Sequence, residues 1–364
     1  MRYLTLCALV ALCLGACCFA QDGDRFADDT VWYDAAKAPM TLCGVLAPTE
    51  KEPYYHRLPA EVAESTSEAV ARLSCQTAGG RVRFYTDSPY ITIHASFWVC
   101  DPLLNLTQIS SAGFGIYTQK GRGPEKYLAK VVAGMGHYDD NEWTVYLSGE
   151  GETVTIYLPL YGGVRDLSVG VKTGSLVREA PGYRIDKPVV FYGSSITQGG
   201  CATRPGNSYQ GMMARSMSMD YVNLGFSGAG KGEQSMANYI AGLELSAFVL
   251  DYDHNAPTPE HLRATHYNFY ETVRRQHPDA PILMVSRPVI DPSPEEVERR
   301  NIIRESWQKA RLAGDKNVYF IDGSKFMTGY AADCWSVDGS HPNELGFSLM
   351  ARAMEKVLKP ALKK

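Results

Sequence analysis

Strand-like apolar runs alternate with helix-like segments through the second half of the chain, and this alternation constrains the fold more than any other feature. The predicted strands are residues 189–193, 221–224, 247–251, 281–286 and 318–322. The predicted helices between and after them are residues 208–219, 234–243, 258–276, 294–313 and 343–358. Such alternation is typical of a parallel sheet covered by helices on both faces. With right-handed crossovers, residues 184–364 are predicted to form a flavodoxin-like three-layer α/β/α domain.

The first half of the chain has a different pattern, with short alternating β runs separated by turn residues. The clearest runs are residues 81–86, 90–99, 143–147, 153–158 and 167–171. Many short strands at near-regular spacing predict an antiparallel, jelly-roll-like β-sandwich over residues 21–183. The runs at 143–147 and 153–158 flank a Ser-Gly-Glu-Gly-Glu turn, and we expect them to form a hairpin. This domain either supports its neighbour only, or lends loops or a carbohydrate-facing surface to the functional site.

Residues 1–20 have the layout of a secretory signal peptide. Arg2 is followed by an apolar run at residues 4–14 and then by small residues, which predicts export to the periplasm or out of the cell. Two endings remain open: cleavage after Ala20, or lipid anchoring through Cys17, because residues 14–17 resemble a bacterial lipobox. No other apolar run approaches the ~18–20 residues that span a bilayer.

Composition narrows the classes of partner. A hydrophobic content of 45% allows a sizeable core, and a net charge of −4 gives no electrostatic reason to expect nucleic acid or an anionic membrane surface. His261 and His266 do not share a helix face well and His254 stands apart, so neither a metal nor another cofactor is predicted.

The cysteines after the leader lack a C-x-x-C motif and leave room for one or two disulfides of unknown pairing. These cysteines are Cys43, Cys75, Cys100, Cys201 and Cys334.

The strand at 189–193 ends in a turn of small residues, where α/β enzymes hold a nucleophile at the carboxyl edge of a sheet. The candidate nucleophile is Ser195, although Thr197 departs from the G-x-S-x-G pattern. The turn resembles the first block of the SGNH (GDSL) hydrolase family, roughly G-D-S-[LI]-T-x-G. Ser194 stands where that family usually has Asp.

Three further stretches resemble the remaining SGNH blocks, in the family's order and at the carboxyl ends of predicted strands. They are residues 223–230, 251–256 and 338–347, which correspond to the Gly, Asn and D-x-x-H blocks. Two departures concern Ala229, where Asn often follows the Gly, and Ala256, where the family usually has Asp. Neither departure removes a catalytic atom.

The resemblance assigns a role to five residues. It makes Ser195 the nucleophile and His341 the general base, and Asp338, three positions earlier, fixes the imidazole tautomer. The backbone N–H groups of Ser195 and Gly228 and the side-chain amide of Asn255 would form the oxyanion hole. Glycine at position 228 lets the backbone approach a substrate closely.

The substrate is predicted by analogy. Residues 113–117 resemble the G-x-D-L-Y motif of a domain that precedes some bacterial SGNH esterases, although Gly115 replaces the Asp. This layout resembles that of bacterial polysaccharide acetylesterases and implies removal of short acyl groups, above all acetyl, from carbohydrate or another small ester. Arg287 and Tyr209 are candidate substrate contacts, with a structural salt bridge as the alternative for Arg287. The competing hypotheses are a lipase or lysophospholipase and a non-catalytic carbohydrate-binding protein. The oligomeric state is not predicted.

Overall fold

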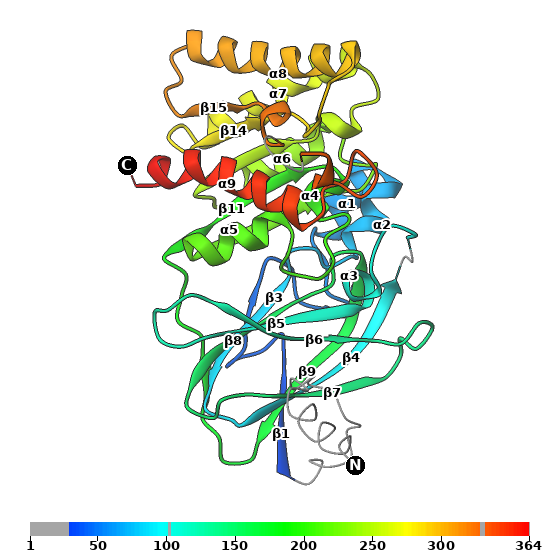
Figure 1. Ribbon diagram of the computed structural model, residues 1–364, viewed down its shortest axis with the longest axis vertical. Coiled ribbons are helices and arrows are strands. Elements are labelled where there is room, and N and C mark those ends of the chain that lie inside the picture. The colour runs from blue at the N-terminus through cyan, green and yellow to red at the C-terminus, as the bar shows by residue number, and fades with distance from the viewer. Residues whose placement is uncertain (1–28, 101–102, 328–331, 364) are drawn as a thin grey trace, which may run out of the picture.

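The computed structural model describes residues 29–100, 103–327 and 332–363 (Figure 1). The predicted leader at 1–20, including Cys17, lies outside the described residues. Within them, no helix combines the length and the apolar character that a membrane span requires. The five cysteines named above are all free thiols.

The first half forms a β-sandwich, as predicted from its alternating strands. One antiparallel sheet has the order β1-β9-β4-β7, and the other has the order β10-β3-β8-β5-β6, with β2 paired to β3. The core between them contains buried residues of both sheets, such as Phe84, Phe114, Ile93 and Val169. The strands are β1 (Thr30–Asp34), β2 (Thr41–Cys43), β3 (Arg81–Thr86), β4 (Tyr90–Cys100), β5 (Gly113–Gln119), β6 (Lys126–Val132), β7 (Asn141–Tyr146), β8 (Glu152–Tyr157), β9 (Gly162–Lys172) and β10 (Val177–Glu179).

The predicted hairpin of β7 and β8 is wrong. Strand β7 pairs with β4, whereas β8 pairs with β3 and β5 in the other sheet. The turn between them therefore carries the chain from one sheet to the other. Both strands direct apolar residues into the core, including Val145 and Val154. Alternation alone identifies a strand with one buried face, but it does not specify the partner of that strand.

The second half is a five-stranded parallel sheet in the order β12-β11-β13-β14-β15, which confirms the flavodoxin-like prediction. Helices α5 and α9 cover one face, and α6, α7 and α8 cover the other (Figure 1). The strands are β11 (Ile185–Gly193), β12 (Met219–Gly225), β13 (Ala247–Asp251), β14 (Ile282–Val285) and β15 (Val318–Ile321). The helices are α4 (Ser195–Gln198), α5 (Tyr209–Met217), α6 (Gln234–Ala241), α7 (Pro259–Gln276), α8 (Pro294–Leu312) and α9 (Glu344–Ala361).

A segment of the first half packs against this second domain. Helices α1 (Ala60–Thr66) and α2 (Glu68–Ser74) place Ala63, Val70 and Leu73 in the same core cluster as residues of α6 and α7. A further short helix, α3 (Gln108–Ala112), precedes β5. The two halves are therefore joined by a shared hydrophobic core as well as by the polypeptide linker.

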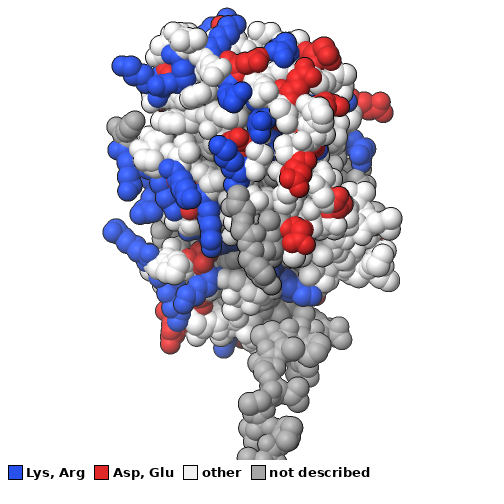
Figure 2. Space-filling view, turned by 45° about the horizontal axis from the view of Figure 1, so that its top comes forward, with Lys and Arg blue, Asp and Glu red and all other residues white. Residues whose placement is uncertain are grey.

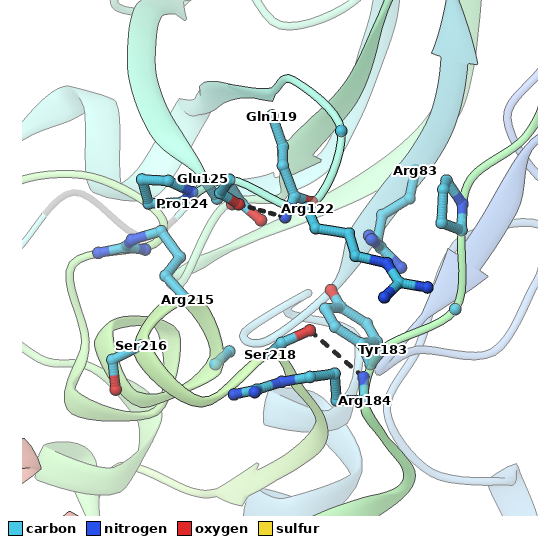
Figure 3. A pocket seen from close by; sticks show the side chains of 15 residues that line it. Arg83, Gln119, Arg122, Pro124, Glu125, Tyr183, Arg184, Arg215, Ser216 and Ser218 are labelled. Carbon is cyan, nitrogen blue, oxygen red and sulfur yellow. Dashed lines mark hydrogen bonds between the residues drawn. The ribbon is translucent and has the colours of Figure 1, made fainter.

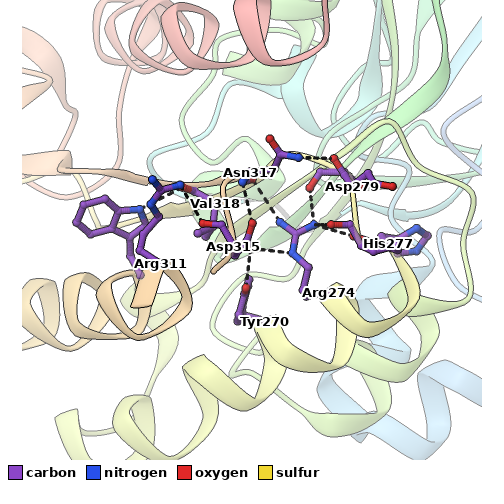
Figure 4. A network of polar contacts seen from close by, with 11 residues as sticks. Tyr270, Arg274, His277, Asp279, Arg311, Asp315, Asn317 and Val318 are labelled. Carbon is purple, nitrogen blue, oxygen red and sulfur yellow. Dashed lines mark hydrogen bonds and ion pairs between the residues drawn. The ribbon is translucent and has the colours of Figure 1, made fainter. Parts of the chain in front are cut away.

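A network of hydrogen bonds and an ion pair connects α7 with the amino ends of β14 and β15, at the edge of the sheet opposite the carboxyl ends of the strands (Figure 4). Arg274, near the end of α7, lies 2.8 Å from Asp315, which also accepts a 2.6 Å hydrogen bond from the Tyr270 hydroxyl. Its guanidinium also donates to the carbonyls of Ala280 and Asn317. These side chains are largely buried, so the network couples α7 to the loops that enter both strands.

Candidate active site

Ser195 begins the short helix α4, directly after β11 ends at Gly193. The Ser194 hydroxyl caps this helix by accepting from the backbone N–H of Ile196 at 3.2 Å. A serine oxygen thus performs a capping role that an aspartate oxygen at this position could also perform. A Cβ on Gly193 would lie 2.1 Å from the hydroxyl oxygen of Thr197, so the tight turn requires glycine there.

His341 lies beside Ser195, although the two residues are 146 positions apart. Its Nε2 is 2.9 Å from Ser195 Oγ, and its Nδ1 is 2.8 Å from Asp338 Oδ2. The other carboxylate oxygen of Asp338 accepts from the backbone N–H groups of His341 and Ser340, at 2.7 and 3.0 Å. Helix α9 is capped by Asn343 and not by Asp338. The carboxylate of Asp338 is therefore free to orient the imidazole.

Asp338 is held in its charged form. Partial burial raises the pKa of its carboxyl, but hydrogen bonds from the backbone and imidazole of His341 outweigh that effect and lower the pKa to about 2. An ionised acceptor at Nδ1 keeps the proton on that nitrogen and leaves Nε2 with a lone pair toward the Ser195 hydroxyl. The arrangement can accept a proton from Ser195.

The Gly and Asn blocks are tied to this turn through Phe226. The backbone N–H of Phe226 donates to the carbonyl of Gly193 at 3.0 Å, and its own carbonyl accepts from the Asn255 side-chain amide at 2.9 Å. Gly228, two residues on, has φ +67, and no heavy atom lies within 4 Å of the position of a Cβ there. The backbone at 228 therefore faces open space, on a turn that Asn255 holds in place.

Tyr209 lies beneath the turn rather than on its open side. The residue is fully buried, and its hydroxyl donates to Asp251 Oδ2 at 3.1 Å. The same carboxyl oxygen accepts from Thr197 at 3.2 Å. Burial raises the pKa of Asp251 well above its usual value. Tyr209 has no exposed surface for a substrate, and in this structure it braces the residues that follow Ser195.

Arg287 lies at the same edge of the sheet, where its charge is shared with protein groups. Its guanidinium is 3.6 Å from Glu296 and 3.3 Å from Nε2 of His254, and its backbone N–H donates to Asp253 at 3.1 Å. Four-fifths of the side chain is buried. The geometry therefore includes the salt bridge that was the alternative to a substrate contact.

His254 is a neighbour of the site whose position the sequence does not reveal. Its Nε2 accepts from the Ser340 hydroxyl at 2.8 Å, and its ring centroid lies 6.0 Å from that of His341. Burial and the nearby Arg287 lower the pKa of His254 to about 3, so the ring is neutral. The sequence feature that could have identified His254 as a site residue is its position directly before Asn255, at the carboxyl end of a predicted strand.

Two residues of the β-sandwich half also reach the site. The Tyr161 hydroxyl donates to the carbonyl of Ser195 at 3.2 Å, and the Asn105 amide donates to Asp338 Oδ2 at 3.4 Å. No catalytic motif marks either residue, because they meet the site only through the packing of the two halves. The candidate site is therefore built from both halves of the chain.

Comparisons with known proteins match each half separately. A model of the GDSL-like lipase/acylhydrolase family matches residues 186–359, and a model of the N-terminus of SGNH-hydrolase-type esterases, named GxDLY, matches residues 30–177. No curated protein sequence matches the chain.

Several solved structures resemble the chain over most of its length. A protein described as a GDSL-like lipase, from Bacteroides ovatus, is 27% identical with a TM-score of 0.81, covering 92% of this chain and 98% of its own. The salicylyl-acyltransferase SsfX3 from a tetracycline biosynthetic pathway is 20% identical with a TM-score of 0.77 over the same shares. A family two carbohydrate esterase from Clostridium thermocellum, solved with cellohexaose, is 15% identical with a TM-score of 0.60, covering 79% and 94%. The last two likenesses concern the fold alone.

Proposed function

We propose that this chain is a serine esterase for short acyl groups, because residues 186–359 match a model of the GDSL-like lipase/acylhydrolase family and residues 30–177 match a model of the N-terminus of SGNH-hydrolase-type esterases. The proposed substrate is an O-acetylated carbohydrate. The observation that carries the proposal is the pair of contacts at 2.9 Å between Ser195 and His341 and at 2.8 Å between His341 and Asp338. Together they supply a hydroxyl, a base and an orienting carboxylate in one line.

In the proposed reaction, Ser195 Oγ attacks the ester carbonyl as Nε2 of His341 takes its proton. The negative charge on the carbonyl oxygen is met by the N–H groups of Ser195 and Gly228 and the amide of Asn255. The intermediate collapses when His341 returns the proton to the leaving alcohol. Water then attacks the acyl-enzyme by the same route, and His341 again accepts and returns a proton. The products are the free alcohol, the carboxylic acid and the original enzyme.

Two observations support the proposal that the alcohol part of the ester substrate is a carbohydrate. One structural neighbour is a carbohydrate esterase solved in complex with cellohexaose, which is an analogy of fold. The β-sandwich half also brings Asn105 to the edge of the site, where it can contribute to the surface that a sugar would meet. Export, through the leader at residues 1–20 or an anchored Cys17, is part of the same proposal and would place the enzyme where polysaccharides occur.

A second candidate is an esterase for longer acyl chains, favoured by exposed leucines beside the site. Leu103 is 44% exposed and Leu104 fully exposed, and both precede Asn105 directly in sequence. Exposed apolar side chains at the rim of a site are suited to contact with an acyl chain.

A chain-length series of nitrophenyl esters distinguishes the two candidates. We expect kcat/KM to be highest for acetyl or propionyl esters and acetate to be released from acetylated polysaccharides. A maximum at eight carbons or more would favour the lipase-type alternative. Ser195→Ala should abolish hydrolysis, whereas Ser65→Ala, at an exposed helix serine, should not change it. If Ser195→Ala retains full activity, the assigned nucleophile is wrong; glycan binding without hydrolysis of any ester would favour the non-catalytic alternative.

A further inference from the structure

A second cavity lies between the β-sandwich and the hydrolase domain and shares no lining residue with the catalytic triad (Figure 3). Its volume is about 780 Å³, which falls within the range of small-molecule sites in proteins. Strand β3, the loop between β5 and β6, the segment before β11 and helix α5 all contribute to its wall. The residues used below are Arg83, Arg122, Glu125, Tyr183, Arg184 and Arg215.

The charge of the lining is strongly unbalanced. Four arginines face one glutamate, Glu125. Burial raises the pKa of Glu125, which further weakens its capacity to neutralise the arginines. Lys and Arg side chains also gather along the left of the face shown in Figure 2, the side on which α5 lies in Figure 1. A concave surface of one charge sign attracts ligands of the opposite sign.

Arg83 is the decisive residue, because it is buried and forms no ion pair within 4.0 Å with any carboxylate in the described part of the chain. Only 4% of Arg83 is exposed, its guanidinium stacks 3.8 Å above the Tyr183 ring, and its Nε has no hydrogen-bond partner among the described residues. Arg81, two positions earlier on the same strand, is also buried but forms an ion pair with Asp220. A buried charge is normally paired with an opposite charge. We therefore expect a ligand to supply an acceptor for the Arg83 guanidinium.

The neighbouring groups hold the cavity in a fixed shape. Arg215 donates to the carbonyl of Gly206 at 2.6 Å and stacks over the Tyr117 ring at 4.6 Å, so one edge of its guanidinium is already positioned. The Tyr183 hydroxyl is buried without a hydrogen-bond partner among the described residues. Arg122 and Arg184 are exposed at the rim, where they can approach a ligand that has entered.

We propose that this interdomain pocket binds a small ligand that carries a carboxylate or phosphate group, of the size of a sugar acid or a sugar phosphate. Guanidinium groups present paired N–H donors that match the oxygens of both anions. In the bound state the anion accepts from Arg83 at the floor and from Arg122 at the rim. The proposal does not depend on the esterase reaction, since the pocket and the triad have separate residues.

The test is calorimetric titration of the full-length chain with D-glucuronate, D-glucose 6-phosphate, inorganic phosphate and, as the neutral control, D-glucose. We expect saturable binding of at least one sugar anion and none of glucose. Arg83→Gln and Arg122→Gln should each weaken binding, Arg83→Gln by about tenfold or more because it removes a charged hydrogen-bond donor. Arg304→Gln, at an exposed arginine of α8, and Ser195→Ala should bind as the unmodified chain does.

The ligand that binds best identifies the anionic group that the pocket recognises. Preference for glucuronate indicates a carboxylate ligand, and preference for glucose 6-phosphate or free phosphate indicates a phosphate ligand. If no anion binds at concentrations up to about 10 mM, or if binding is unchanged in both arginine variants, the proposal is wrong. Thermal melting of Arg83→Gln shows whether the variant is folded, and Arg122→Gln, at the exposed rim, tests the pocket without altering its buried floor.

Discussion

Replacing Asp338 by asparagine tests how the site controls its histidine. One oxygen of Asp338 accepts from two backbone N–H groups, at 2.7 and 3.0 Å. In Asp338→Asn these donors will retain the amide oxygen, so the amide NH₂ takes the position 2.8 Å from Nδ1 of His341. Nδ1 must then accept a hydrogen bond, which moves the imidazole proton to Nε2. A protonated Nε2 has no lone pair for the Ser195 hydroxyl.

The expected loss is therefore large, although the shape of the side chain hardly changes. A wrong tautomer of this kind lowers kcat by roughly 10³–10⁴-fold, or about 4–6 kcal/mol of transition-state stabilisation. The assay is kcat for nitrophenyl acetate at pH 8, with a thermal melt to show that the fold is intact. Asp333→Asn, an exposed aspartate nearby in sequence, is the matched control. A folded Asp338→Asn enzyme with more than about a tenth of the original kcat would refute this account of the tautomer.

Three further changes have defined outcomes. Asn255→Ala should lower kcat by about 10²–10³-fold with little change in KM, because an oxyanion donor is lost; an unchanged kcat would exclude this role. Burial raises the pKa of the Asp253 carboxyl to about 6. The neutral carboxyl therefore stabilises the folded state below pH ~4, and this contribution to the free energy of unfolding is lost as the pH rises through about 6. Asp253→Asn should raise the urea midpoint at about pH 8 more than at about pH 4. Arg274→Met leaves Asp315 buried without its ion-pair partner and should lower the free energy of unfolding by about 3 kcal/mol in urea titration, while kcat per folded molecule stays the same.

The hydrolase domain is the part of the fold that the sequence predicts best. Its elements are local: the predicted strand at 247–251 coincides with β13, and the predicted helix at 258–276 differs from α7 by one residue at its start. The parallel sheet follows from their alternation, because parallel neighbours need a crossover and the helices provide it. The pairing of Ser195 with His341 was predicted from the resemblance to the SGNH blocks, and the position of those blocks after parallel strands placed them at one edge of the sheet.

The β-sandwich was predicted less completely, because its pairings are non-local. The residues of β7 and β8 were identified as strands, but each finds its partner in a different sheet. Helices α1 and α2 were not predicted, since each has only seven residues and is stabilised by packing against the other half of the chain. His254 had no identifiable role for a similar reason: its position beside Ser340 depends on two loops that meet only in the folded protein.

The first half of the chain is a structural component of the hydrolase site and not an appended module. Arg57, which is buried, donates to the carbonyls of Asn223 and Gly225 at the end of β12 and stacks on Phe226. Phe226 in turn accepts from Asn255, so a side chain from residue 57 supports the turn that carries Gly228. The hydrolase domain alone would lose this support and would expose the apolar surface that α1 and α2 now cover. The proposed oxyanion donors therefore depend on both halves folding together.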